Sequence, residues 1–198
     1  MNMKRRKSIL SSLLLLYPIN IIAKVNNNFT MFFEKGIFMR TKKGFKVNSG
    51  EARFGKSYKM KGVTLNNLDI KISGKDTDGE LAVFEQTGFT PNGGPPLHIH
   101  LYQDEWFFVT EGEYLFQVGE DRYNMKAGDT IFLPRNVPHA FIQLTEKAKT
   151  IVSYLPAGKM EDFFKTTDSW TTTPSTEEVI KVFEDHGMKI VGKPLKLE

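Results

Sequence analysis

Short runs with β-type alternation follow one another from Leu68 to Leu155, and no segment with helical periodicity interrupts them. Turn residues separate these runs at a spacing of ~8–12 residues, a rhythm typical of an antiparallel barrel or sandwich. We therefore predict an all-β protein. The predicted strands are Leu68–Ser73, Glu80–Gly88, Leu97–Leu101, Glu105–Thr110, Glu113–Val118, Arg122–Met125, Asp129–Leu133, His139–Leu144 and Thr150–Leu155.

The two flanks of this region have a different character. Residues 24–65 are irregular and rich in glycine, and we interpret them as an N-terminal lead-in with one or two edge strands. Residues 157–198 carry helical signals but are too few to bury a core of their own. The predicted organisation is one barrel over residues 66–156 with a short C-terminal helical arm.

Two signals mark helices in the arm. Glu161–Phe164 is predicted to form one short turn. Ser175 followed by Glu178 has the pattern of a capping box, which predicts a helix that ends at Gly187. His186 lies near the end of that helix, where an imidazole interacts favourably with the helix dipole, so we interpret it as structural and not as a ligand.

Residues 1–23 have the order of a secretory signal peptide. Met1–Lys7 is positively charged, Ser8–Tyr17 is apolar, and the small residue Ala23 follows. The apolar stretch is too short to span a bilayer as a relaxed helix, so no stable membrane anchor is expected. We predict an exported protein, periplasmic or secreted, with a cytoplasmic protein as the alternative.

The formal net charge of +4 is confined to that segment. Residues 1–23 hold four basic side chains and no acid, which leaves 23 basic and 23 acidic side chains in the remainder. A nucleic-acid-binding domain needs excess basic charge on its folded surface, so no nucleic-acid partner is expected. The chain has no cysteine, so any metal must be held by nitrogen and oxygen ligands.

Three of the four histidines fall in two short segments of the β region. His98 and His100 are two residues apart on one predicted strand, so their imidazoles point to the same face. Glu105 joins that face only if the intervening polar residues turn the chain into the next strand. His139 opens a later strand. Three imidazoles and one carboxylate suit a divalent first-row metal and leave coordination positions open.

These segments resemble the two motifs of the cupin superfamily. The residues that match the motifs are His98, His100, Glu105, Gly112, Gly128, Pro134 and His139. Two departures are Asn136, where the family often has glycine, and Gln143, where it often has asparagine. The resemblance implies a single cupin barrel, of the jelly-roll or double-stranded β-helix type. It also implies a set of four metal ligands, His98, His100, Glu105 and His139.

More narrowly, the segment around Gly94–His100 and the tail over residues 186–195 resemble bacterial cupins similar to quercetin 2,3-dioxygenase. This resemblance implies cleavage of a small enol or flavonol with O2 at one divalent Fe, Mn, Ni or Co ion, with Zn also possible. Glu105 would be both a ligand and the catalytic acceptor of the substrate's hydroxyl proton. Two alternatives remain open: a non-catalytic cupin that binds a small molecule or metal, and a sugar isomerase or epimerase of the same fold.

Strand alternation also supplies candidates for a pocket that takes a small-molecule substrate. The candidate pocket residues are Phe107, Tyr114, Phe116, Phe141 and Gln143. Trp106, Phe108 and Phe132 are expected to face outward, where one small barrel offers them no cover. A homodimer is therefore predicted.

Overall fold

The computed structural model describes residues 40–197. The predicted signal peptide, residues 1–23, and residues 24–39 of the lead-in lie outside this part, so export stays a prediction. Within the described part the strands form two antiparallel sheets, and no helix there is long and apolar enough to cross a membrane.

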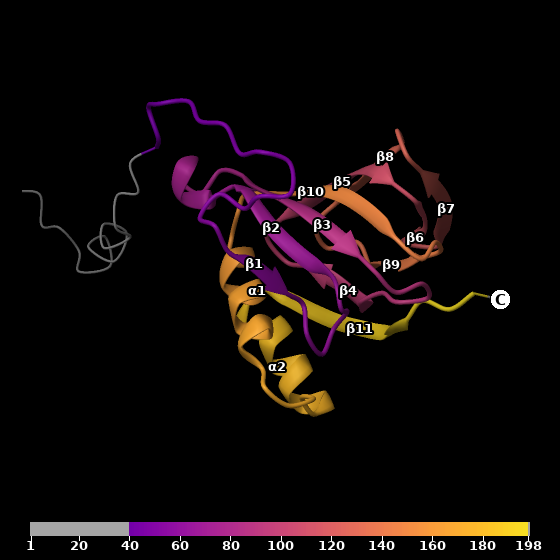
Figure 1. Cartoon of the computed structure of the whole chain (residues 1–198). Coiled ribbons are helices and arrows are strands. Elements are labelled where there is room, and N and C mark those ends of the chain that lie inside the picture. Colours follow the sequence, from indigo (N-terminus) through magenta and orange to yellow (C-terminus); the bar gives the residue numbers. More distant parts are fainter. Residues whose placement is uncertain (1–39, 198) are drawn as a thin grey trace, which may run out of the picture. The chain divides into compact units, whose positions relative to one another are not determined.

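Figure 1 shows the strands of the two sheets, and all of their pairings are antiparallel. The first contains, in spatial order, β1 (Ser57–Lys59), β2 (Asn67–Ile72), β3 (Ala82–Gly88), β10 (Ala148–Leu155), β5 (Asp104–Glu111) and β8 (Thr130–Leu133). The second contains β11 (Met188–Pro194), β4 (Pro96–His100), β9 (His139–Gln143), β6 (Glu113–Val118) and β7 (Asp121–Lys126). A single 3-10 turn, η2 (Gly74–Asp76), lies between β2 and β3.

The sheets close around an aromatic core. Phe107 on β5 contacts Phe116 on β6 and Phe141 on β9, with ring centroids 5.1 and 5.7 Å apart. These rings meet edge to face, which adds to the free energy gained by burying their apolar surface. The predicted fold class, an all-β cupin-type barrel with a short helical arm, is confirmed.

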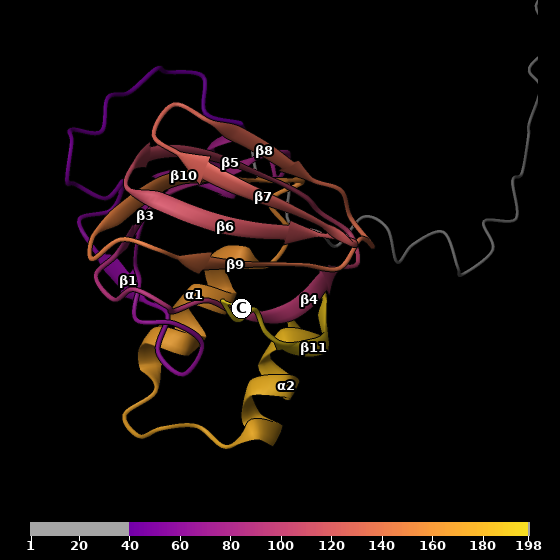
Figure 2. The same cartoon turned by 90° about the vertical axis from the view of Figure 1, so that its right-hand side faces the viewer.

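The arm contains two helices, α1 (Met160–Ser169) and α2 (Thr176–Asp185). Figure 2 shows both at one side of the barrel, with α1 near β1 and α2 near β11. The predicted capping box of α2 is confirmed, because the Ser175 hydroxyl accepts from the Glu178 N–H and the Glu178 carboxylate accepts from the Ser175 N–H. Gly187 follows the helix with a φ of 79°.

The prediction of one short turn at Glu161–Phe164 is wrong, because α1 has ten residues. Its buried side chains, Met160, Phe163, Phe164 and Thr167, lie at helical spacing on one face. The polar residues between them weakened this pattern in the sequence. Burial against the barrel stabilises the extra turns.

The sequence reading also missed a strand at the end of the chain. β11 pairs with β4, so that Met188 lies opposite His100 and Ile190 opposite His98. Gly192 and Pro194 are unfavourable in strand interiors, and the pairing depends on a partner nearly ninety residues away in the sequence. β11 is an edge strand, where proline and glycine are tolerated.

Aromatic side chains on the outer face of the first sheet lie where strand parity predicted them. Trp106 and Phe108 are half-buried, and Phe132 is 56% exposed. The predicted homodimer through this face stays a prediction.

Candidate metal centre

Three strands bring the four predicted ligands to one point inside the barrel. β4 supplies His98 and His100 from the same face, and β9 supplies His139, which lies opposite His98 in the ladder. A turn after His100 lets β5 start at Asp104, so Glu105 points inward as the sequence reading required. All four side chains are buried.

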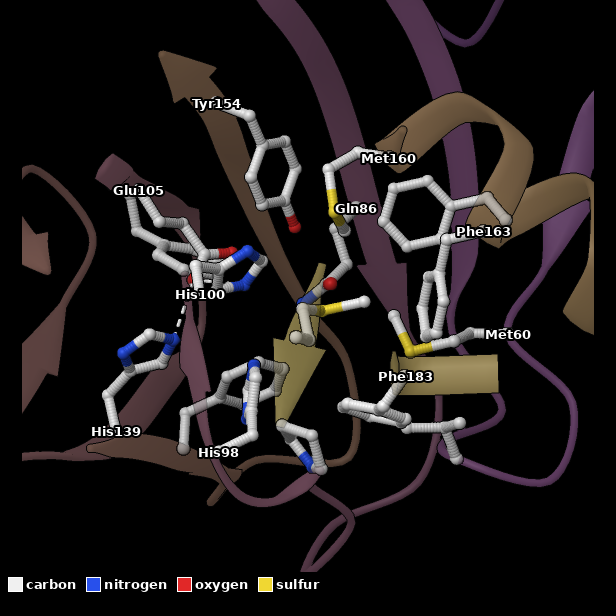
Figure 3. A pocket seen from close by; sticks show the side chains of 16 residues that line it. Met60, Gln86, His98, His100, Glu105, His139, Tyr154, Met160, Phe163 and Phe183 are labelled. Carbon is white, nitrogen blue, oxygen red and sulfur yellow. Dashed lines mark ion pairs between the residues drawn. The ribbon is translucent and has the colours of Figure 1, made fainter. Parts of the chain in front are cut away.

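The donor atoms of these residues lie within 4.8 Å of one another. His139 Nε2 is 3.1 Å and His100 Nε2 is 3.7 Å from Glu105 Oε2. The His100 and His139 rings are almost parallel, with an interplanar angle of 9° (Figure 3). This arrangement can hold one metal ion.

Backbone carbonyls orient two of the imidazoles. His98 Nδ1 lies 2.8 Å from the Pro96 carbonyl oxygen, and His139 Nδ1 lies 2.9 Å from the Val137 carbonyl oxygen. A carbonyl accepts only from N–H, so these contacts place the proton on Nδ1 and leave the Nε2 lone pair free. The Nε2 atoms are therefore the ligand atoms.

The electrostatics of the cluster favour the ligating protonation states. Burial lowers the pKa of His98 well below its usual range and that of His100 to about 4, so both imidazoles are neutral at pH 7. Burial alone would raise the pKa of Glu105, but the close approach of His139 and the other two imidazoles lower it to about 2. The cluster thus combines the neutral imidazoles of His98 and His100 with an ionised carboxylate.

This donor set fits a divalent metal. His139 Nε2 is buried and has no hydrogen-bond partner among residues 40–197, despite its approach to the carboxylate. An unpaired buried nitrogen is costly unless something binds it, and a cation bound by Nε2 and the carboxylate would remove that cost.

Two turns hold the ligand strands in place. Asn136 has a φ of 63° and its N–H donates to the His100 carbonyl at 2.8 Å, so asparagine occupies a left-handed position that usually favours glycine. Gly94 precedes β4, and a Cβ there would lie 1.8 Å from the Phe141 carbonyl oxygen. Only glycine permits this approach of β4 to β9.

A cavity of about 30 Å³ lies beside the cluster. Its barrel wall carries the ligands together with Phe107, Phe141, Tyr154 and Gln86. Its opposite wall comes from the arm and the loop after β1. The principal residues of that opposite wall are Met60, Met160, Phe163, Phe164, Phe183 and Met188.

Of the five predicted pocket residues, Phe107 and Phe141 line the cavity and three do not. Tyr114 and Phe116 lie deeper in the barrel, behind the Phe141 ring, with centroids 5.8 and 5.4 Å from it. Gln143 lies at the far end of β9, where its Nε2 donates to the Thr145 carbonyl at 2.7 Å. The structure does not bring these three residues to the cavity, because inward parity does not specify depth along the barrel.

Several site residues were missed. Tyr154 lies opposite Glu105 in the β5–β10 ladder, and burial together with the Glu105 charge raises its pKa well above its usual range, so its hydroxyl stays protonated. Gln103 approaches His100 as a hydrogen-bond partner, although Gln103 Oε1 and His100 Nδ1 are buried and make no hydrogen bond of normal geometry within residues 40–197. Strand alternation could have identified Tyr154. No local signal could have identified Gln103.

His186, which the sequence reading treated as structural, is not part of the cluster. Its Nδ1 lies 2.7 Å from the Val182 carbonyl oxygen at the end of α2. Its ring contacts Phe163, with centroids 5.7 Å apart.

Comparison with known proteins places the β region in a family. Residues 87–154 match the model of the cupin domain. This segment of the chain is a cupin domain. The four candidate metal ligands lie inside the matched segment, so the candidate metal centre belongs to the cupin domain.

Individual relatives are distant from this cupin. It is 30% identical over 98 residues to a quercetin 2,3-dioxygenase of Bacillus subtilis, a match over 49% of this chain and 28% of that protein. It is 35% identical over 43 residues to an uncharacterized protein of Methanocaldococcus jannaschii, covering 22% of this chain and 34% of the relative. The chain thus spans about a third or less of these curated relatives.

Solved structures with a similar fold include an RmlC-like cupin from Shewanella frigidimarina. That structure is 20% identical, with a TM-score of 0.48 over 63% of this chain and 99% of the other.

Proposed function

We propose that this cupin is a metal-dependent dioxygenase that cleaves a small enolic substrate with O2. The observation that carries the proposal is the buried cluster of three imidazoles and one ionised carboxylate beside an apolar, aromatic cavity. The 30% identity to a quercetin 2,3-dioxygenase over 98 residues supports the same class of reaction.

His98, His100, His139 and Glu105 would hold the ion, and their donor set suits divalent Fe, Mn, Ni or Co, or Zn. Such an ion, when bound, polarises the oxygen atoms of the substrate and lowers the pKa of its hydroxyl group. Glu105 can accept the hydroxyl proton on a carboxylate oxygen, because the imidazoles keep it ionised. Phe107 and Phe141 exclude water from the reacting face of the substrate.

The size of the cavity argues for a small substrate. About 30 Å³ is room for only a few water molecules, whereas sites for drug-sized ligands occupy roughly 300–1,000 Å³. A flavonol does not fit beside the cluster while the arm is packed as it is here. The substrate is therefore a compact enol or enediol, or the arm must move before a larger one enters.

Oxygen consumption tests the proposal. Protein loaded in turn with Fe, Mn, Ni and Co is mixed with hydroxyacetone, whose enol form is a compact enediol, and with quercetin, in an oxygen electrode. Uptake of O2 that depends on metal and on the compact substrate is expected. Exchange of solvent deuterium into a sugar without O2 uptake would replace the proposal with an isomerase or epimerase, and binding without any turnover would make this a non-catalytic cupin.

A further inference from the structure

Outside the metal cluster, the cavity wall carries a buried amide whose nitrogen makes no hydrogen bond of normal geometry with any residue from 40 to 197. Gln86 lies on β3, is 2% exposed and lines the cavity together with the four ligands. Its Nε2 atom has no hydrogen-bond partner among the described residues. Figure 3 shows the amide between the imidazoles and the side chains of the arm.

The neighbours of Gln86 do not satisfy this amide. Thr150 lies directly opposite it on β10, and the Tyr114 side chain is beside it. The Tyr114 hydroxyl approaches Gln86 as a hydrogen-bond partner, but the contact falls short of normal geometry, and among residues 40–197 both this hydroxyl and that of Thr150 are buried without a well-formed hydrogen bond. A buried amide without a bond costs about 1–3 kcal/mol, whereas leucine at the same place would avoid this cost. A polar group at position 86 therefore makes no evident contribution to the stability of the fold.

The rest of the wall is chemically different. Apart from the four ligands and Tyr154, the cavity is lined by proline, valine, methionine and phenylalanine side chains. Tyr154 contacts Glu105, so its hydroxyl already has a neighbour in the cluster. The Gln86 amide, with a donor and an acceptor, is left to meet whatever occupies the cavity.

We propose that Gln86 is the substrate-positioning residue of this cavity and selects a small compound with two oxygen functions. One oxygen faces the metal cluster, and the other, a hydroxyl or carbonyl, is hydrogen-bonded by the Gln86 amide. This inference rests on the proposed function, since it takes the cluster as the place where the substrate reacts. The volume of about 30 Å³ restricts the compound to few non-hydrogen atoms.

The test compares Gln86→Leu with Thr150→Val, which removes an equally buried, unpartnered polar atom that does not line the cavity. Each Co-loaded protein is titrated with hydroxyacetone and followed by the visible absorption of the cobalt ion. Gln86→Leu is expected to bind the probe roughly 10- to 100-fold more weakly than wild type, and Thr150→Val to bind it equally well. Metal content, measured by elemental analysis, should be the same in all three.

Thermal unfolding supplies a second readout. If Gln86 serves to bind a ligand, replacing it should not destabilise the ligand-free protein. Gln86→Leu should therefore unfold at the wild-type temperature or above. A structural role would lower that temperature. Gln86→Met, which keeps the side-chain length, should show the same loss of binding if the leucine variant does not fold. Metal-free protein, followed by the rise in unfolding temperature with hydroxyacetone, repeats the comparison without cobalt.

Equal affinity of wild type and Gln86→Leu, or no binding of the probe by wild type in either assay, would overturn the inference. Binding that depends on Gln86 without O2 uptake from any substrate would leave the inference standing and remove the dioxygenase proposal. Uptake of O2 with an unchanged KM in Gln86→Leu would support the dioxygenase proposal and overturn the inference about Gln86.

Discussion

The two walls of the cavity are built in different ways. The barrel wall is β-sheet: β5, which carries Glu105, is hydrogen-bonded to β10 on one side and β8 on the other. The arm wall is made of side chains from α1, α2 and the start of β11, and consists of methionine and phenylalanine. The first wall holds charge and donor atoms in fixed positions, and the second supplies only shape and exclusion of water.

The barrel wall therefore carries the reacting groups, and the arm wall determines which ligands can enter. Changes in the barrel wall should remove metal binding or turnover, whereas changes in the arm should alter stability and the size of ligand that enters. The two walls also touch each other: the Phe183 ring packs edge-on against the His98 ring, with centroids 5.4 Å apart, and the Phe164 ring lies 6.3 Å from the Tyr154 ring. The arm therefore also supports a metal ligand from behind.

The largest effect is expected from the imidazoles. His139→Ala removes a nitrogen donor that no neighbouring side chain replaces, so metal affinity should fall at least ~100-fold, beyond the range for residues that only support ligands. Activity should be lost with the metal. Elemental analysis after dialysis measures this, with His186→Ala as the control that keeps its metal. Tight metal binding by the His139→Ala and His98→Ala proteins would show that the ion binds elsewhere.

Glu105→Gln should separate binding from turnover. The amide oxygen can still ligate weakly, but it cannot accept the substrate proton, so the rate per bound metal should fall by about 10²–10⁴. Rates are compared at measured metal content, with excess metal supplied. Normal turnover per metal in this variant would remove the proton-transfer role of Glu105 but leave its role as a ligand.

In the arm, Phe163→Ala should cost about 3–5 kcal/mol of unfolding free energy, because it empties a buried ring position. The variant should keep its metal and accept a wider ligand such as catechol, which wild type excludes. Urea unfolding and catechol titration measure the two effects. Phe132→Ala, at a position 56% exposed on the outer face, is the matched control and should change neither. Loss of metal in Phe163→Ala would contradict the separation of the two walls.

The barrel wall should also make the metal-free protein sensitive to acid. The folded-state pKa of His100 is about 4 against an ordinary 6.5, so the unfolded chain binds more protons in this interval and stability falls as pH drops from 6.5 to 4. Glu105, about 2 against 4.5, stabilises the fold above pH 4.5, and that contribution is lost as pH falls toward 2. Urea midpoints at pH 7 and 5 test the first interval. Equal midpoints would contradict the neutral, buried state of His100.

The smallest effect is expected at the rim of the barrel wall. Arg135 makes a two-pronged pair with Asp104, next to Glu105, at 2.6 and 3.1 Å. Both side chains are partly exposed, so Arg135→Ala should cost under about 1 kcal/mol. Metal content should not change. A large loss of metal in this variant would mean that the rim, and not only the strands, positions the carboxylate.

The same contrast explains what could be read from the sequence. The barrel wall follows local rules: two-residue strand periodicity placed His98 and His100 together, and the polar turn before Asp104 allowed Glu105 to join them. Asn136 was expected to tolerate a left-handed turn, and it has a φ of 63°. These features depend on a few neighbouring residues, so a pattern in the chain can reveal them.

The arm wall follows no such rule. Met160, Phe163 and Phe183 reach the cavity because the arm folds back over the barrel, which depends on contacts between segments far apart in the chain. Inside the barrel, strand alternation predicted that Tyr114 and Gln143 point inward. It could not predict how far they lie from the metal cluster. Gln86 was not singled out, because an inward polar residue becomes unusual only when its neighbours are known.

The pairing of β11 with β4 has a consequence for the order of biosynthesis. β4 meets β9 only at the His98–His139 pair, and its other edge is covered by β11, near the end of the chain. The strand with two histidine ligands therefore gains its second partner only after both helices of the arm have been synthesised. A chain that ends before β11 should hold His98 and His100 less firmly and compete poorly for scarce metal ions.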